Sequence, residues 1–193
     1  MRLVFGEKDT PYEEARVVVL PVPYDLSLSF LPGARRGPEA ILLASRELEP
    51  FLLELGAAPE EVGIHAAEPV PWVAGMAEES HRLIREEALR HLRAGKWVVA
   101  LGGDHSVTHP LVQAHREALG DFSLLHVDAH ADLYPEWQGS VYSHASPFYR
   151  LLTEGFPLVQ VGIRAMDRDS LRLARKFFFS SRRRHTRFLN VTG

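Results

Sequence analysis

Cysteine is absent from all 193 residues of the sequence. The chain therefore cannot form disulfide bonds, and it offers neither a thiol nucleophile nor thiolate ligands for a closed zinc site. Residues 1–16 lack an apolar run and include acidic side chains, which argues against a secretory signal peptide. No stretch is both long and apolar enough to span a bilayer. These absences predict a cytoplasmic protein that does not enter a membrane.

Positive charge is scarce over most of the chain. The formal net charge is -3, yet residues 180–193 hold four arginines and no acidic residue. The remainder of the chain has 18 basic against 25 acidic residues. A nucleic-acid-binding surface needs clustered positive charge, so the composition predicts no nucleic-acid partner.

The last segment differs in composition from everything before it. Residues 177–193 begin with three successive phenylalanines and continue into a run of arginines. This segment can be interpreted as a solvated basic tail or as a contact with nucleic acid or membrane. We favour a third interpretation, a non-native tail, because the segment resembles translated sequencing-adapter DNA. We therefore assign residues 1–176 to the N-terminal part of a single domain and leave 177–193 out of the fold.

Short apolar runs alternate with longer amphipathic segments through the body of the chain. Runs of β-branched residues bounded by proline or glycine predict buried strands, whereas apolar residues spaced by three and four predict helices. Alternation of the two is typical of a mainly parallel sheet with helices on both faces. We therefore predict an α/β fold with three layers, α/β/α. The expected strands are 17–20, 97–101, 122–127 and 158–163, and the expected helices are 39–55, 78–93, 110–119, 147–152 and 168–175.

Polar side chains follow two of the expected strands at the points where the strands end. Asp128, His130 and Asp132 alternate after one strand, so in an extended chain they project to the same side. His105 follows the preceding strand and two glycines, which permit a tight turn. Carboxylate and imidazole ligands together suit manganese, iron, zinc or cobalt. The sequence therefore predicts a metal site formed by these four residues.

Each of these residues also has a purely structural interpretation. A lone histidine such as His105 is more often a hydrogen-bonded structural residue than a ligand, and the acidic residues could form an exposed carboxylate cluster. We expect His126 to belong to the core or to support the ligands. We expect Asp104 to orient the site through hydrogen bonds. Asp167 and Asp169 have the spacing of ligands, but we interpret them as the start of a helix.

Two of these motifs resemble the first two signature motifs of the ureohydrolases, the family of arginase, agmatinase, guanidinobutyrase and formiminoglutamase. They are Gly102–Ser106, with the sequence GGDHS, and Asp128–Asp132, with the sequence DAHAD. Three further segments are similar to family loops and a family strand. These segments are Pro32–Pro38, Tyr142–Ala145 and Val161–Arg164.

The resemblance covers residues 15–176 and implies an arginase-like fold that is incomplete at the C-terminus. It also implies two Mn²⁺ ions per active site. By position, His105 and Asp132 would bind one ion, His130 the other, and Asp128 would bridge both. The family's third motif supplies two more aspartates and does not occur in this sequence. Full-length members of the family are expected to form homo-oligomers.

The resemblance further implies hydrolysis of a small guanidino substrate to urea and an amine. Two metal ions can acidify a shared water and so supply hydroxide near neutral pH. Asp132 would help to pass a proton to the leaving amine, and His144 would contact the substrate or shuttle protons. Residues 139–143 contain no asparagine, whereas arginases use an Asn- and Ser-bearing loop there to bind the α-carboxylate. We therefore expect agmatine, which yields putrescine, or N1-aminopropylagmatine, which yields spermidine, in polyamine biosynthesis.

Other functions remain open at this point. Within the same family, an arginase or a guanidinobutyrase would carry similar motifs. A two-metal phosphoesterase also places Asp and His at strand ends, although it acts on a different bond. Outside enzymes, the chain could be an inactive metal-binding remnant, since it carries only part of the family's ligand set.

Overall fold

A computed structural model describes residues 5–6, 9–49, 51–180 and 187–189 of the chain. The chain divides into two compact units, Met1–Ala118 and Leu119–Gly193. Each unit contains one small sheet with three strands among the described residues. All pairings between the strands of these two sheets are parallel, which confirms the mainly parallel arrangement that the sequence predicts.

The first unit is organised around β1 (Val17–Val22), which pairs with β2 (Ile64–Ala66) on one side and β3 (Trp97–Gly102) on the other. The strand continues past Pro21, two residues further than predicted. Because β2 pairs only as far as Val19, the missing N–H of Pro21 costs no ladder bond on that side. The helices of this unit are α1 (Gly37–Ala44), α2 (Ala77–Arg93) and α3 (Thr108–Leu119), with shorter turns η1 (Ala34–Arg36), η2 (Ser45–Glu47), η3 (Pro59–Val62) and η4 (His105–Val107).

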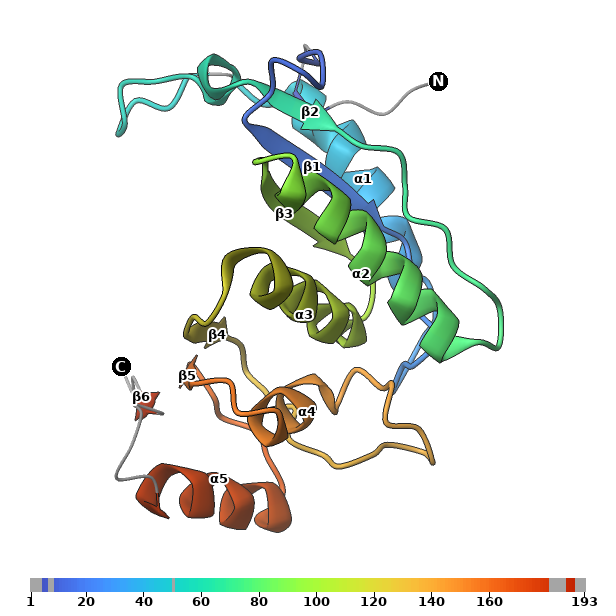
Figure 1. Cartoon of the computed structure of the whole chain (residues 1–193), viewed down its shortest axis with the longest axis vertical. Coiled ribbons are helices and arrows are strands. Elements are labelled where there is room, and N and C mark those ends of the chain that lie inside the picture. The colour runs from blue at the N-terminus through green and yellow to red at the C-terminus, as the bar shows by residue number, and fades with distance from the viewer. Residues whose placement is uncertain (1–4, 7–8, 50, 181–186, 190–193) are drawn as a thin grey trace. The chain divides into compact units, whose positions relative to one another are not determined.

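Helices cover both faces of the sheet in the first unit. Successive side chains of a strand point to opposite faces. Val18 accordingly packs in one buried cluster with Ile84 of α2, whereas Val19 packs in another with Leu42 of α1. Figure 1 shows α1 and α2 on opposite sides of β1. The predicted α/β/α layering is therefore present in this unit.

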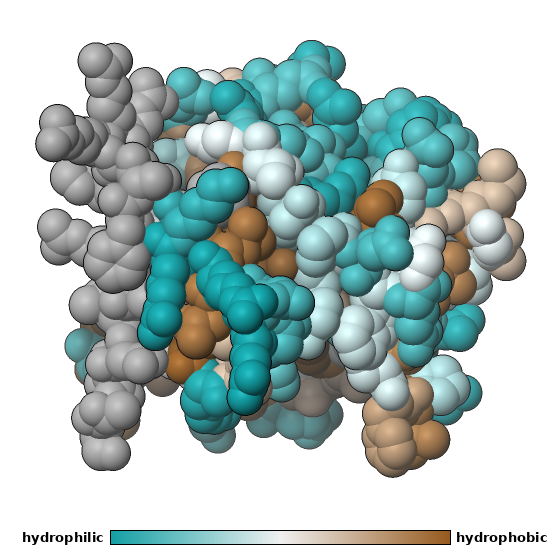
Figure 2. All heavy atoms as spheres, turned by 90° about the horizontal axis from the view of Figure 1, so that it is seen from below, coloured by the Kyte–Doolittle hydropathy of each residue, from teal (hydrophilic) through white to brown (hydrophobic). Residues whose placement is uncertain are grey.

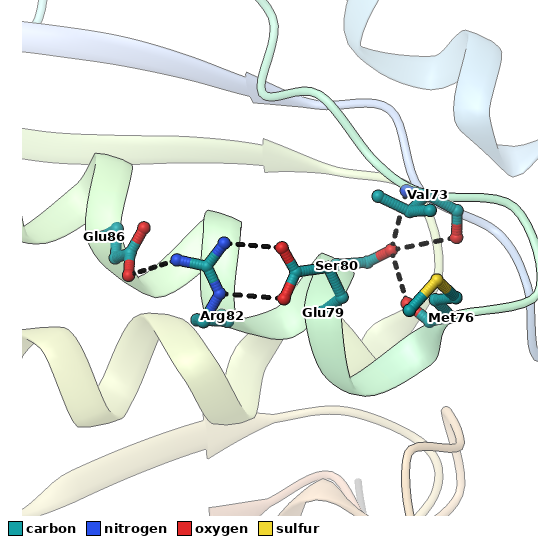
Figure 3. A network of polar contacts seen from close by, with 6 residues as sticks. All are labelled: Val73, Met76, Glu79, Ser80, Arg82 and Glu86. Carbon is teal, nitrogen blue, oxygen red and sulfur yellow. Dashed lines mark hydrogen bonds and ion pairs between the residues drawn. The ribbon is translucent and has the colours of Figure 1, made fainter.

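Helix α2 matches its predicted range of 78–93 to within one residue. At its start, the buried Ser80 hydroxyl accepts a hydrogen bond from the Val73 N–H and donates to the Met76 carbonyl (Figure 3). The neighbouring Arg82 guanidinium bridges two glutamates on the exposed face of the helix (Figure 3). Gly95 ends the helix with a positive φ of 75° and donates to the carbonyl of Leu92.

The prediction of a helix over residues 39–55 is wrong in its second half. Helix α1 ends at Ala44 and is followed by the single turn η2, with Leu48 already extended. The sequence has a proline at position 50, which cannot stand in a helix interior because it lacks an N–H and collides with the preceding turn. The Ser45 hydroxyl donates to the Leu42 carbonyl at 2.8 Å and satisfies a carbonyl at the helix end.

The second unit contains the sheet β4–β5–β6, formed by Leu124–Val127, Leu158–Val161 and Arg187–Leu189. Its helices are α4 (Pro147–Thr153), which ends one residue past its predicted range, and α5 (Arg168–Ser180), which continues five residues past the predicted end at residue 175. Burial alternates along β4, where His126 is buried but the Leu125 and Val127 side chains are 70% and 71% exposed. The exposure of these two side chains leaves one face of β4 uncovered among the described residues. On the face of the molecule drawn in Figure 2, hydrophobic residues lie exposed between hydrophilic ones.

The proposed non-native tail falls partly outside the described residues, which exclude 181–186 and 190–193. Residues 177–180 continue α5, and 187–189 form the strand β6 beside β5. The assignment of residues 1–176 to one domain and of 177–193 to a foreign tail remains a prediction. Among the described residues, no helix has the length and apolar character needed to cross a membrane.

Candidate active site

The loop after β3 lies tightly against the loop after β1. Gly103 donates its N–H to the Val22 carbonyl, and Asp104 donates its N–H to the Tyr24 carbonyl at 2.8 Å. A Cβ atom on Gly103 would lie only 1.9 Å from the Tyr24 carbonyl oxygen. Position 103 therefore requires glycine because of this close approach. The sequence predicted a tight turn at the paired glycines, but neither of them has a positive φ.

Asp104 fixes this loop from within. Its side chain is buried, with the residue only 4% exposed. One carboxylate oxygen accepts hydrogen bonds from the N–H and hydroxyl of Ser106, and the other accepts from the N–H and hydroxyl of Ser27, both at 3.0 Å. His105, the predicted ligand, is held between Asp104 and Ser106 at the first position of η4. The carboxylate thus has the supporting role expected for it.

Two residues missed in the sequence support the same loop. His81 of α2 places its Nε2 3.3 Å from the Ser106 hydroxyl. The His81 ring also packs edge-on against Tyr24, with ring centroids 5.6 Å apart. Burial, together with the nearby Asp104 charge, raises the pKa of Tyr24. The sequence does hold a signal for His81. It lies three residues before Ile84, and this spacing places it on the apolar face of α2.

The Pro32–Pro38 loop is held by a second buried carboxylate, Asp25. This side chain accepts hydrogen bonds from the N–H groups of Gly33 and Arg35 and forms an ion pair with the Arg35 guanidinium at 2.7 Å. Burial alone would raise the pKa of Asp25, but these donors and the Arg35 charge together lower it. The Arg35 guanidinium also lies over the Trp72 ring at 5.1 Å. The loop is therefore ordered by charge as well as by its prolines.

In the second unit, main-chain contacts with the end of β5 hold the loop that follows β4. Asp128 donates its N–H to the Val161 carbonyl, and the Ala129 carbonyl accepts the N–H groups of Arg164 and Ala165. Gly162 has a φ of 85°, and a Cβ atom there would approach the Asp128 carbonyl oxygen to 3.1 Å. The Val161–Arg164 segment therefore serves as the support of the Asp128–Asp132 motif.

The structure brings two of the predicted ligands, Asp128 and His130, into contact. An Asp128 carboxylate oxygen accepts the His130 N–H at 2.7 Å and lies 3.4 Å from the His130 Nδ1. The other oxygen lies 3.8 Å from Nε2 of His126. The Asp128 and His130 side chains are 31% and 67% exposed, so a cation can reach both. A half-exposed carboxylate beside imidazole nitrogens fits a divalent transition metal.

Asp132 departs from the extended geometry on which the same-side argument depended. Strand β4 ends at Val127, and Asp132 has a left-handed φ of 49°. Its carbonyl accepts the N–H of Tyr149 at 3.3 Å, which ties the bend to α4. The predicted alternation of side chains therefore does not continue to Asp132, because the extended strand ends at Val127 and the backbone bends at Asp132.

His126 belongs to the core, as expected. It is buried, its ring stacks on Phe148 with centroids 3.8 Å apart, and its Nδ1 lies 2.8 Å from Nε2 of Gln160. Gln160 is fully buried and also donates to the Ala131 carbonyl at 2.8 Å. Sequence reasoning missed this residue, although a lone glutamine in an apolar strand was a usable signal.

The predicted catalytic His144 lies half-buried in the long loop between β4 and α4. Its ring meets the Trp137 ring edge-on, with centroids 6.3 Å apart. Asp167, the other candidate acidic residue, accepts the Ser170 N–H at 2.6 Å and caps α5, while Asp169 lies in the first turn of that helix. The interpretation of these two aspartates as a helix start is confirmed.

Comparison with known proteins gives a consistent family. The arginase family model matches residues 15–186. The N(1)-aminopropylagmatine ureohydrolase of Thermus thermophilus is 98% identical over 176 residues, which cover 91% of this chain and 60% of that protein. The chain thus spans about three-fifths of the length of this relative.

Two solved structures have the same fold. The agmatine ureohydrolase of Thermoplasma volcanium matches with a TM-score of 0.80 and 25% identity, over 98% of this chain and 62% of that chain. Formiminoglutamase from Trypanosoma cruzi with Mn²⁺ matches with a TM-score of 0.78 and 23% identity, over 89% of this chain and 61% of that chain. The second similarity concerns the fold alone.

Proposed function

The chain belongs to the arginase family, and from this premise we propose that the complete protein is a two-metal ureohydrolase acting on N1-aminopropylagmatine. Hydrolysis of the guanidino group would release urea and leave spermidine. The observation that carries this proposal is the 98% identity to a protein of that name over 91% of the chain. The absence of asparagine from residues 139–143 favours a substrate without an α-carboxylate and so supports the same choice.

Four side chains of this chain would hold the metal. They are His105, Asp128, His130 and Asp132, which together would supply the imidazole and carboxylate ligands. The contact between Asp128 and His130, and their exposure to solvent, support this assignment in the second unit. The first unit would contribute His105 on a loop that Asp104 already holds. Imidazole and carboxylate ligands suit manganese among other divalent metals, and the resemblance to the ureohydrolases makes manganese the first ion to test.

The remaining chemistry falls to the side chains around the substrate. When bound, the two cations would acidify a shared water and supply hydroxide at neutral pH. A guanidinium carbon is a poor electrophile because its charge is delocalised, so orientation of the substrate matters greatly. Asp132 would transfer a proton to the leaving amine, and His144 would contact the substrate or shuttle protons.

Agmatine is the second candidate substrate. It lacks the aminopropyl group but presents the same guanidino end, and its hydrolysis would give putrescine. The fold similarity to an agmatine ureohydrolase favours it. The relative turnover of the two substrates distinguishes the proposals, since a site adapted to the longer amine should lose kcat/KM with the shorter one.

The test uses a full-length chimera in which this chain replaces the aligned part of the Thermus relative. After chelation, the chimera is supplied with Mn²⁺, and bound metal and urea release are both measured. We expect metal uptake and urea release from N1-aminopropylagmatine, and a loss of at least about a hundredfold in kcat/KM for Asp128→Asn. Glu136→Gln, an exposed carboxylate change in a neighbouring loop, is the matched control. Absence of bound metal in the unsubstituted chimera would refute the proposal.

The cytoplasmic location and the homo-oligomeric state expected from the sequence remain predictions. Neither affects the choice of substrate or of the four metal ligands.

A further inference from the structure

His144 lies in a tight turn directly before helix α4. The Ser146 N–H donates a hydrogen bond to the Ser143 carbonyl at 3.2 Å, so His144 and Ala145 are the two central residues of a four-residue turn. Helix α4 begins at the next residue, Pro147. The backbone direction at His144 is therefore set by the geometry of this turn.

The Ser143 side chain holds the same turn from inside. Its hydroxyl oxygen accepts the Ala145 N–H at 3.2 Å and lies 3.0 Å from the Ser146 hydroxyl oxygen. A serine hydroxyl that bonds to the backbone two residues further along mimics a backbone turn. Ser143 and Ser146 are only 2% and 0% exposed, so water has little access to these bonds. One buried hydroxyl thus contacts the two residues that follow His144.

The second serine shows that the turn takes precedence over the helix. Ser146 occupies the N-cap of α4, where a serine side chain usually accepts an N–H of the first helical turn. In the described part of the chain, the Ser146 hydroxyl makes no such capping bond and lies beside the Ser143 hydroxyl instead. The helix therefore lacks a common stabilising bond, whereas the turn around His144 has an additional one.

The residue that enters the turn is held by different contacts. The Arg150 guanidinium lies over the Tyr142 ring, 4.8 Å from its centroid. The Tyr142 N–H donates to the Ser140 hydroxyl at 3.1 Å. These contacts act before the turn, whereas the Ser143 hydroxyl acts within it. Ser143 is therefore the side chain best placed to control the backbone at His144.

We propose that Ser143 is a positioning residue that fixes the turn carrying His144 and so directs the His144 side chain. This inference rests on the proposed function only in giving His144 a role at the substrate. Turn types differ in the backbone angles of their two central residues, so each type would direct the His144 side chain differently. Holding one type in advance reduces the entropy lost when the imidazole is brought to the substrate.

The first experiment measures the order of the turn in this chain. Amide hydrogen exchange is followed residue by residue in the unsubstituted chain and in Ser143→Ala, which removes only the hydroxyl. We expect exchange of the Ala145 N–H to rise about fivefold, because this N–H loses one hydrogen bond of ordinary strength. Unchanged exchange at Ala145 would overturn the inference.

Two controls separate a local effect from general loosening. The Trp137 N–H donates to the Ser140 carbonyl at 3.0 Å in the same loop and should keep its exchange rate in Ser143→Ala. Ser170→Ala removes another buried hydroxyl of the second unit, in α5, and should leave exchange at Ala145 unchanged. An equal rise at Trp137, or an equal rise at Ala145 in Ser170→Ala, would reject a specific role of Ser143.

The second experiment asks whether Ser143 acts through His144. In the full-length chimera, Ser143→Ala should lower kcat/KM about fivefold, whereas the same change made on a His144→Asn background should have no further effect. A merely structural role for Ser143 would lower kcat/KM on both backgrounds and would overturn the inference. If His144→Asn alone leaves kcat/KM unchanged, the role of His144 in the proposed function fails, and the exchange measurements still decide whether Ser143 holds the turn.

Discussion

The loops that follow β3 and β4 carry the two signature motifs, yet they are held in different ways. In the first, the 4%-exposed Asp104 accepts four hydrogen bonds from two serines, and Gly103 lies against the Tyr24 carbonyl. In the second, the backbone around Asp128 is fixed by the end of β5, and its carboxylate stays 31% exposed. Main-chain bonds hold both loops, but a buried carboxylate also holds the first, whereas the carboxylate of the second stays accessible.

This difference indicates which acidic residues suit metal binding. A carboxylate that is buried and accepts several hydrogen bonds already serves a structural purpose, as Asp104 does. A carboxylate near imidazole nitrogens and open to solvent can exchange water for a cation, as Asp128 can. The sequence places both aspartates at strand ends, so the environment distinguishes them. The two loops should also respond differently to substitution.

Gly103→Ala should break the first loop and cause the largest loss of stability. The added Cβ would overlap the Tyr24 carbonyl at 1.9 Å, and backbone at both sites would have to shift. We expect a loss of more than about 3 kcal/mol of unfolding free energy, measured by urea denaturation.

The control for this substitution is Gly95→Ala in the same unit. Gly95 has a φ of 75°, but nothing lies within 4 Å of its added Cβ. Only backbone strain remains, which costs about 1 kcal/mol. Equal losses in the two variants would show that the close approach to Tyr24 does not matter.

Gln160→Leu tests the second loop and should have an intermediate effect. The substitution removes the donor to the Ala131 carbonyl and the partner of His126 Nδ1 in a fully buried position. Leaving such buried groups unsatisfied costs about 1–3 kcal/mol. Gln113→Leu makes the same change at a half-buried position in α3 of the first unit, and it controls for the loss of an amide outside the loop after β4. If the two variants unfold at the same urea concentration, Gln160 does not support the loop after β4.

Local sequence patterns predicted those features that depend on neighbours in the chain. Helix α2 followed from its apolar face and from Gly95, and the contact of Asp128 with His130 followed from their proximity in sequence. The contact of His126 with Gln160 spans 34 residues, and no local pattern reports such a pairing. The short strand β2 contains only three residues and depends on pairing with β1, so it was missed.

Asp25→Asn should cause the smallest loss of stability at neutral pH. The pH dependence of that loss tests whether the charge of Asp25 holds its loop. The pKa of Asp25 is lowered in the folded chain by the Gly33 and Arg35 N–H groups and by the Arg35 guanidinium, despite the opposing effect of burial. A lowered folded pKa stabilises the fold above the ordinary carboxyl value of about 3.9, and this stabilisation is lost as pH falls through the folded pKa. The unsubstituted chain should therefore exceed Asp25→Asn in stability at neutral pH, and the gap should shrink below about pH 4.

Acid should consequently loosen the Pro32–Pro38 loop that Asp25 holds, whereas Gln160 in the second unit carries no charge to lose. Urea denaturation at neutral pH and at about pH 3 measures the unfolding free energy of the unsubstituted chain, Asp25→Asn and Gln160→Leu. Each gap is the difference in unfolding free energy between the unsubstituted chain and one variant. The Asp25→Asn gap should narrow in acid while the Gln160→Leu gap persists, because an amide does not titrate in this range. A constant Asp25→Asn gap at both pH values would show that Asp25 acts through packing alone. The charge of a carboxylate would then not be what holds the Pro32–Pro38 loop.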